Sequence, residues 1–518
     1  MNFKGHRPES YLHKNEEILI SLAHELHKII KQTTHLFHYD SLQFDDEKTE
    51  KIAHSIIEFA EDIYLEIGIW RAYENYNLKT FGTPLPCTME KGSQIPDNDI
   101  FNESRIQHFL WNIYGIVEPD LILSPFHQDL LMLSKEVVNF LNNSKTKFPR
   151  YSSVKKYLKN PEYDAHIIKR KLIWLGTKSY FFRDSFNNYL RKEETEEKMR
   201  EKILLIDDFI NQSSTMWSGL AVVDILPDLL VIPENRKNDI KTWYERHLAF
   251  YLVRSARGSK IIAQNIINGS SYRIVHGTKI SPFKEGEVIL GSTVKYGDDW
   301  YWSGLQKQLG KIPEDQIKEL REDFIQRNSL VVYRYNKQLL ESARTKTTEF
   351  YNEFVVAYGD DFKCFDSGLN YIASEQKREG EKYETLSEEQ FEELKVKHKL
   401  KNKSPNFGVP ENVLNCENGV AVYYNENVGQ EIIIEFNDLI TAFEKHGLNL
   451  SQKDFDNITS LFEDRSISPE FVKKIISLYG TKSIMKAYHI DNQDDIDYLL
   501  HKHKGQYYKQ TYPTLTFN

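Results

Sequence analysis

Aromatic and basic side chains concentrate in the segment 254–302, and they are the residues with the clearest capacity for binding. Aromatic rings can stack on nucleotide bases, and guanidinium groups can pair with phosphates. The predicted binding residues are Tyr272, Arg273, Trp300, Trp302, Arg254 and Arg257. In a strand, however, the alternation of Trp300, Tyr301 and Trp302 would place both tryptophans on one face, where they can fill the core of a small barrel. We favour this core interpretation, because Glu285, Glu287, Asp298 and Asp299 also weaken any local positive field.

Carboxylates gather at three other places, where a hydrolytic metal centre would need ligands. They are Asp207 with Asp208, then Asp360 with Asp361 and Asp366, then Asp491, Asp494, Asp495 and Asp497 ahead of His501 and His503. A metal needs ligands that converge from several segments, and proximity in sequence does not supply convergence. The last group fits a helix N-cap with an acidic first turn. We therefore predict neither a metal site nor a cofactor.

His24 and His27 lie three residues apart, a spacing that places both on one helix face, as in metal-binding pairs. The apolar periodicity of the same helix explains them equally well as boundary residues, which is our interpretation. Pro227 and Asp228 followed by Glu234 and Lys237 resemble the charged core of a restriction-type nuclease, but the spacing between Glu and Lys is wrong for that core. We treat this similarity as coincidence.

Motifs that would name a reaction are missing from the sequence. Trp217-Ser218-Gly219 lacks the first glycine of a nucleophile elbow, and Gly310-Lys311 is followed by Ile312 where a phosphate-binding loop needs Ser or Thr. Cys87, Cys364 and Cys416 are too far apart in sequence for a Cys-x-x-Cys pair. Whether the protein is an enzyme is left open by these motifs.

The composition is that of a folded protein. The chain has 518 residues, is 40% hydrophobic and carries a net charge of −9, so it has the apolar material for a core but no global field to attract a polyanion. The N-terminus is polar, and we find no apolar run long enough to cross a bilayer. Sparse cysteines suit a reducing compartment. These features predict a cytoplasmic protein with no membrane contact.

Periodicity divides the chain into five parts. Apolar residues recur at helical spacing over 18–30 and 47–67, with Glu58, Glu61, Asp62 and Glu66 expected largely on the outer face of the second helix. A long helix is expected from Glu234 to about Arg257, ending at Gly258. The predicted domains are 1–257 (helical), 258–310 (an aromatic-rich β module), 311–374 (helical), 375–404 (a charged linker) and 405–518 (a C-terminal α+β domain).

The C-terminal part carries the most consistent local signals. The segments 420–424 and 431–435 are typical of a β-hairpin. Ser451 with Asp454 resembles a capping box, and Ser468-Pro469 is typical of a helix start, with Gly480 as its stop.

Together these patterns predict a predominantly helical α+β protein with an embedded, barrel-like antiparallel β module. Its modular layout and the missing catalytic motifs favour a cytoplasmic interaction or regulatory protein that binds a protein partner or a second copy of itself. One alternative is a metal-dependent hydrolase or nuclease whose carboxylates come from distant segments. A second alternative is a nucleic-acid-binding adaptor that uses the β module, although the net charge does not favour it.

Overall fold

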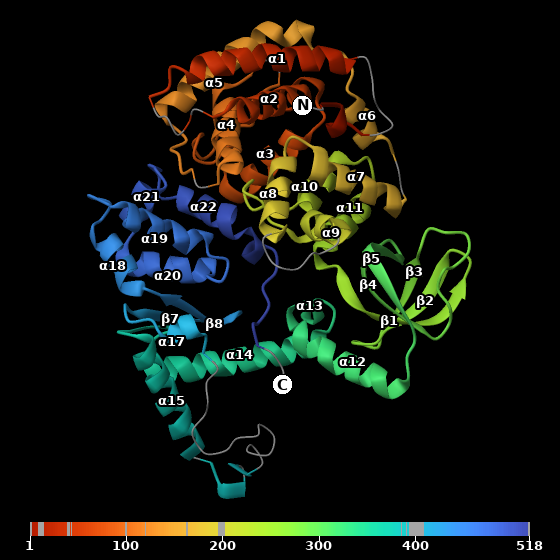
Figure 1. Cartoon of the computed structure of the whole chain (residues 1–518), viewed down its shortest axis with the longest axis vertical. Coiled ribbons are helices and arrows are strands. Elements are labelled where there is room, and N and C mark those ends of the chain that lie inside the picture. Colours follow the sequence, from red (N-terminus) through yellow and green to blue (C-terminus); the bar gives the residue numbers. More distant parts are fainter. Residues whose placement is uncertain are drawn as a thin grey trace. The chain divides into compact units, whose positions relative to one another are not determined.

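The computed structural model describes residues 3–8, 15–38, 42, 44–98, 101–119, 121–161, 164–194, 202–384, 386–389, 391–392 and 409–515 (Figure 1). The chain forms two compact units. The first comprises Met1–Lys337, Tyr488–Tyr508 and Phe517–Asn518, and the second comprises Gln338–Ala487 and Lys509–Thr516. Helices predominate in the described residues and accompany two small sheets, which confirms the predicted fold class. None of the described helices combines the length and the apolar character needed to span a bilayer.

Most of the first unit is helical. In order, its helices are α1 (Asn15–Thr34), α2 (Asp46–Leu65), α3 (Ile69–Phe81), α4 (Glu103–Val117), α5 (Gln128–Ser144), α6 (Ser153–Lys159), α7 (Ala165–Lys178), α8 (Arg183–Glu194), α9 (Lys202–Gln212), α10 (Val222–Leu229), α11 (Glu234–Lys241), α12 (Glu314–Arg327) and α13 (Ser329–Tyr333). Short 3-10 helices lie at Phe3–His6, Lys145–Lys147 and Thr242–Glu245. From the far end of the sequence, α22 (Asp495–Lys504) and the 3-10 turn Gly505–Tyr508 complete this unit.

The apolar face predicted for α2 forms the centre of the first unit. Ile52, Ile56 and Phe59 are fully buried, and Phe59 stacks on Phe109 with ring centroids 4.6 Å apart. The aromatic run Tyr180-Phe181-Phe182 is buried too, and Phe181 stacks on Trp217 at 4.5 Å. Phe59, Phe109, Phe181 and Trp217 therefore form part of the core of this unit.

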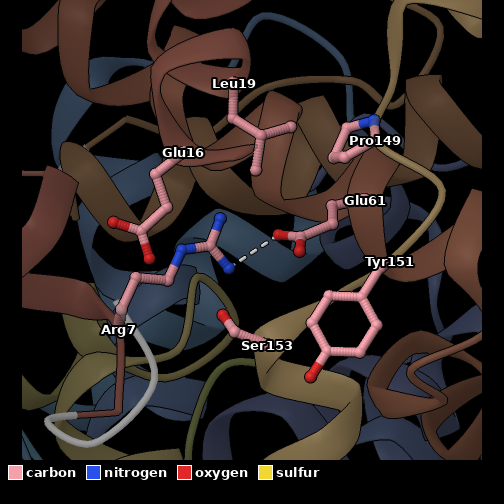
Figure 2. Close-up of a pocket in the computed structure, with 7 residues that line it drawn as sticks. All are labelled: Arg7, Glu16, Leu19, Glu61, Pro149, Tyr151 and Ser153. Atoms are coloured by element: carbon pink, nitrogen blue, oxygen red, sulfur yellow. Dashed lines mark ion pairs between the residues drawn. The ribbon is translucent and has the colours of Figure 1, made fainter. Parts of the chain in front are cut away.

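The outward position expected for Glu58, Glu61 and Asp62 in α2 is wrong. Glu58, Glu61 and Asp62 are only 6%, 2% and 2% exposed. Glu58 forms an ion pair with Arg183. Glu61 forms an ion pair with Arg7, with Oε2 lying 2.7 Å from Nη1 of the arginine (Figure 2). Because each carboxylate has a positively charged or hydrogen-bonding partner, its burial is tolerated.

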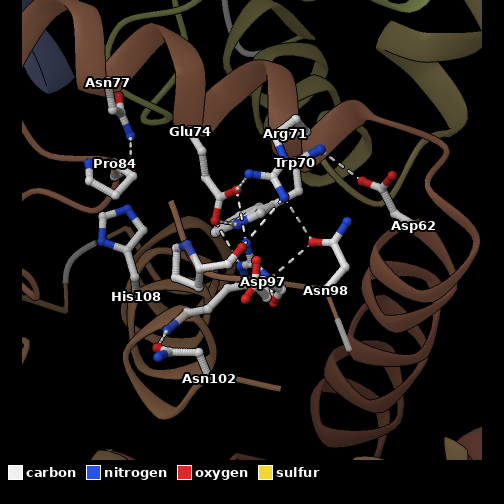
Figure 3. Close-up of polar contacts among 12 residues, drawn as sticks. Asp62, Trp70, Arg71, Glu74, Asn77, Pro84, Asp97, Asn98, Asn102 and His108 are labelled. Carbon is white, nitrogen blue, oxygen red and sulfur yellow. Dashed lines mark hydrogen bonds and ion pairs between the residues drawn. The ribbon is translucent and has the colours of Figure 1, made fainter. Parts of the chain in front are cut away.

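Asp62 holds the corner between α2 and α3. Its carboxylate accepts hydrogen bonds from the backbone N–H groups of Gly68 and Trp70, each at 2.7 Å, and from the hydroxyl of Tyr180. One turn into α3, Glu74 accepts from Arg105 at 2.7 Å and from the indole of Trp70 at 2.9 Å (Figure 3). Helical periodicity cannot reveal such pairs, because the partners come from other segments.

The β module consists of β1 (His247–Arg257), β2 (Lys260–Asn265), β3 (Ser271–Val275), β4 (Glu287–Tyr296) and β5 (Asp299–Lys311). The helix expected from Glu234 to Arg257 is wrong beyond Lys241, where α11 ends. Along β1, Ala249, Tyr251 and Val253 are buried at alternate positions, and the strand pairs with both β2 and β4. This two-residue period favours a strand once partners are present.

The five strands pair in the order β1-β2-β3-β5-β4, and β4 returns to β1. All neighbours are antiparallel except β3 and β5, which run parallel and pair over only two residues, Ile274 with Trp300 and Val275 with Tyr301. The five strands therefore form a small barrel that includes one short parallel seam.

The second unit contains α14 (Lys337–Tyr358, from its second residue), β6 (Phe362–Phe365), α15 (Gly368–Glu384), α17 (Glu411–Leu414), β7 (Val420–Asn425), β8 (Gly429–Ile434), α18 (Phe436–Glu444), α19 (Gln452–Glu463), α20 (Pro469–Tyr479) and α21 (Lys482–Ala487). The predicted hairpin is confirmed as β7 and β8, and β6 adds a third strand. The predicted capping box of Ser451 and the helix start at Ser468 are also confirmed. As a division into domains, the five predicted segments stay a prediction. Within the predicted linker 375–404, residues 385, 390 and 393–404 lie outside the described residues.

Candidate functional site

The aromatic residues predicted for binding in the β module contact one another. Tyr272 is 3% exposed, and its hydroxyl lies 3.0 Å from Nδ1 of His247. Trp300 and Trp302 are half-buried. The ring of Trp300 lies 4.4 Å from that of Tyr272, and the ring of Trp302 lies 5.5 Å from that of Tyr251. This packing supports the interpretation of these rings as core residues and leaves Tyr272 no free face for a base.

The basic residues predicted beside them are exposed, but several have partners. Arg254 donates to Oε1 of Gln264, while Arg273 and Lys260 both pair with Asp299. Burial raises the pKa of Asp299, but the hydrogen bonds from Arg273 and Lys260 outweigh it and lower the pKa below its usual range. Asp299 therefore compensates part of the charge of Arg273 and Lys260.

Asp207 and Asp208 lie in a buried network of charges. Asp207 is 2% exposed, pairs with Lys169 of α7 at 2.7 Å and with Arg246, and accepts a hydrogen bond from Ser303 of β5 at 2.8 Å. Burial alone would raise the pKa of Asp207, but the charges of Lys169 and Arg246 dominate and lower it to about 2. Asp208 pairs with Arg246 as well. These contacts tie α7 and α9 to the β module and account for both carboxylates without a metal.

The other predicted carboxylates have separate environments. Asp360 and Asp361 both pair with Lys474 in the second unit, and Asp366 is exposed. Asp494 is the N-cap residue of α22 and pairs with Lys91, whereas Asp495 and Asp497 lie in its first turn, as predicted. Asp491 is exposed in the loop before that helix.

The histidines predicted near these carboxylates are placed by packing. The ring of His501 lies against Phe81, and the ring of His503 lies against Tyr488. Burial lowers the pKa of His503 to about 3. The nuclease-like similarity lies on helices, because Pro227 is inside α10 and Glu234 pairs with Lys237 in the first turn of α11.

A strongly basic segment was missed by the sequence analysis. Between residues 145 and 159 there are six basic residues and no Asp or Glu, in a chain that is acidic overall; they are Lys145, Lys147, Arg150, Lys155, Lys156 and Lys159. Tyr151 and Tyr157 are interleaved with them. Runs of basic residues with aromatic neighbours are typical of polyanion-binding surfaces, so a scan of local charge would have found this segment.

Four of these six basic residues line a groove with the end of α2. We call it the basic groove and define it by Tyr64, Leu65, Glu66, Arg150, Tyr151, Ser152, Lys155, Lys156 and Lys159. Its volume is about 480 Å³, which is enough for a ligand the size of a nucleotide. All of these residues belong to the first unit.

The backbone around the basic groove is held by buried contacts. Ser152 is 3% exposed, accepts a hydrogen bond from the backbone of Lys155 as the N-cap of α6, and donates to Oε1 of Glu61 at 2.7 Å. Behind this turn, Arg7, Glu16 and Glu61 surround a small hollow that Tyr151 also lines (Figure 2). The cations of the groove are thus presented by an anchored turn and a short helix.

Positive charge dominates the basic groove. Four cations face one carboxylate, that of Glu66, whose Oε2 lies 3.9 Å from Nζ of Lys155. Burial lowers the pKa of Lys159; the charges of Asp62 and Asp228 oppose this shift, and those of Lys155 and Lys237 add to it. A bound anion would favour the charged form of these lysines, so the groove is suited to phosphate.

Comparison with known proteins adds a family match for the part of the chain that contains the basic groove. Residues 9–246 match a family described as "Protein of unknown function (DUF3843)". The match covers less than half of the 518 residues. No curated protein and no solved structure matches the chain.

Proposed function

We propose that the protein binds a single-stranded nucleic acid, and that the basic groove is the binding site. The observation that carries this proposal is the ratio of four basic side chains to one carboxylate in a groove of a chain with net charge −9. Phosphate contacts supply most of the affinity of sequence-independent nucleic-acid binding. A locally concentrated cation cluster is therefore the feature that such binding requires.

The arrangement of the cations suits a strand. Lys155 and Lys159 are one helical turn apart on α6, so their stems are about 5–6 Å apart on one face. Arg150 precedes the helix and extends the row of positive charge. Together with Lys156 they can follow the phosphates of an extended backbone.

Tyr151 favours a single strand over a duplex. Its side chain is 41% exposed at the groove, next in sequence to Arg150. Base stacking on an aromatic ring contributes about 1–3 kcal/mol per base and requires an unpaired base. The hydroxyl of Tyr64 donates to the backbone carbonyl of Leu141, and this contact fixes that ring as part of the wall.

The sequence analysis considered nucleic-acid binding by the β module as an alternative. This proposal retains nucleic-acid binding but places it at the basic groove. In the β module, Asp299 compensates Arg273 and Lys260, and Tyr272 is buried. Binding of a protein partner, self-association and a cytoplasmic location stay predictions.

The proposal can be tested by fluorescence anisotropy of a labelled 20-nucleotide single strand titrated with the full chain. Replacing Lys156, which is exposed, by Ala should weaken binding about fivefold, since an exposed ion pair contributes up to about 1 kcal/mol. The change Glu66→Gln removes the carboxylate of the groove and should tighten binding by a few fold. Opposite effects of two surface substitutions cannot arise from a general loss of folding.

Arg254→Ala is the matched control, because Arg254 is an exposed cation of the β module. We expect this variant to bind the single strand as the wild type does. If Arg254→Ala weakens binding while Lys156→Ala and Glu66→Gln do not change it, the site is in the β module and our proposal is wrong. If a duplex or a phosphorylated peptide binds more tightly than the single strand, the proposed ligand class is wrong.

A further inference from the structure

Two helices of the first unit bring together three side chains that can bind a metal. His24 lies on α1, and Glu50 and His54 lie one turn apart on α2. Their ligand atoms all lie within 4.8 Å of one another. Nε2 of His54 is 3.7 Å from Oε1 of Glu50, a separation too long for a hydrogen bond. It is, however, compatible with two ligands of one ion.

We propose that His24, Glu50 and His54 bind one divalent transition-metal ion, and that Zn²⁺ is the ion they suit best. Two imidazoles and one carboxylate are a ligand set that zinc uses in proteins. With Zn²⁺ bonds of about 2.0–2.1 Å, ligand atoms 3.7 Å apart subtend an angle of about 130° at the ion. Small rotations of the three side chains would bring this angle close to the tetrahedral value.

The register of the two helices explains why these three residues meet. Further along α1, His27 lies 3.2 Å from the hydroxyl of Thr49 and 3.4 Å from Oδ1 of Asp46, near the start of α2. Because α1 and α2 run antiparallel, His24 lies one turn back and reaches Glu50 and His54. The sequence analysis considered His24 and His27 as a metal-binding pair on one helix. The structure instead brings His24 of α1 close to Glu50 and His54 of α2.

The surroundings are suited to one ion with an open position. His54 is 2% exposed, and its ring lies edge-on to that of His24 with centroids 6.3 Å apart. Glu58, the next carboxylate along the same face of α2, pairs with Arg183. His24 is exposed, so solvent can reach the fourth coordination position. Three protein ligands with an open position distinguish this site from a closed structural zinc site.

The test is a Zn²⁺ titration of the full chain, stripped of metal with a chelator, in competition with a chromophoric chelator at pH 7.5. We expect one tight ion per chain. The change His24→Ala removes an exposed ligand with little risk to folding, and it should weaken binding at least about 100-fold. Glu50→Gln should also weaken it.

His27→Ala is the matched control, since it removes an imidazole from the same helix outside the proposed site. We expect it to bind Zn²⁺ within about twofold of the wild type. Equal affinities for the wild type and His24→Ala would overturn the proposal. A larger loss in His27→Ala than in His24→Ala would place the ion beside Asp46 and overturn it as well. None of these outcomes depends on nucleic-acid binding.

Discussion

The buried carboxylate of Glu431 gives the second unit a dependence on pH that one substitution should remove. Glu431 lies on β8, is 5% exposed, and accepts a hydrogen bond from the backbone N–H of Ser468 at 2.7 Å. Burial dominates over the hydrogen bonds from Ser468 and Asn425 and raises the pKa of Glu431 from 4.5 to about 7. Charge on this residue therefore destabilises the folded unit.

The sign and size of the effect follow from proton linkage. Between pH 4.5 and pH 7 the folded state holds a proton that the unfolded state has lost, so the free energy of unfolding falls as the pH rises. At 1.36 kcal/mol per pKa unit, the full penalty is about 3 kcal/mol and is present above pH 7. The change Glu431→Gln should stabilise the second unit by about this amount at pH 8 and by less than about 0.5 kcal/mol at pH 4.5.

Thermal melting monitored by circular dichroism and by tryptophan fluorescence can isolate this effect. All seven tryptophans lie in the first unit, so a transition seen by circular dichroism and not by tryptophan fluorescence reports the second unit. For a unit of this size, 3 kcal/mol corresponds to a rise in Tm of about 6–12 °C. Glu426→Gln, at an exposed acid in the β7–β8 turn, is the control and should leave the pH dependence unchanged. If Glu431→Gln shifts the Tm equally at pH 4.5 and pH 8, the reasoning is refuted.

Three further predictions concern the first unit and can be measured by urea unfolding with tryptophan fluorescence. Asp207→Asn should destabilise the unit by about 3–5 kcal/mol, because Lys169 and Arg246 stay buried but lose the charge of this carboxylate. A destabilisation below 1 kcal/mol would contradict the buried network. Gly219→Ala should lower the free energy of unfolding by more than 1 kcal/mol and loosen α22. Gly219 has φ +73°, and an added Cβ would lie 2.3 Å from the carbonyl oxygen of His501. Unchanged hydrogen exchange in α22 would count against this prediction. Glu66→Gly should stabilise the unit by up to about 1 kcal/mol, because Glu66 ends α2 with φ 52° in the left-handed region, which glycine adopts more easily. A loss of stability would show that the Glu66 side chain contributes more free energy than its backbone strain removes.

Local signals predicted the parts of the fold that depend on neighbouring residues in the chain. The apolar faces of α1 and α2, the hairpin of β7 and β8, and the helix starts at Ser451 and Ser468 all follow from spacing and capping. The strand 247–257 did not, because its apolar residues fit both a helix and a strand. Pairing with β2 and β4 decides between the two.

Functional residues were harder to predict, because they depend on contacts between segments. The basic run 145–159 was visible in the sequence, but the facing residues are remote from it: Tyr64 lies in the last turn of α2, and Glu66 is the C-cap of that helix. His24 and His54 are thirty residues apart, and only the register of two helices brings them together. Glu58 and Glu61 looked like solvated charges because Arg183 and Arg7, which bury with them, are remote in sequence.

The salt dependence of single-strand binding is the most direct test of the basic groove. Each phosphate contact contributes a slope of about −0.7 to a plot of log K against log salt concentration, so the four cations of the groove should give the wild type a slope of about −2.8. Lys156→Ala should reduce this slope to about −2.1, and Arg254→Ala should leave it unchanged. A wild-type slope near zero, or a slope that falls in Arg254→Ala and not in Lys156→Ala, would contradict the proposed nucleic-acid site.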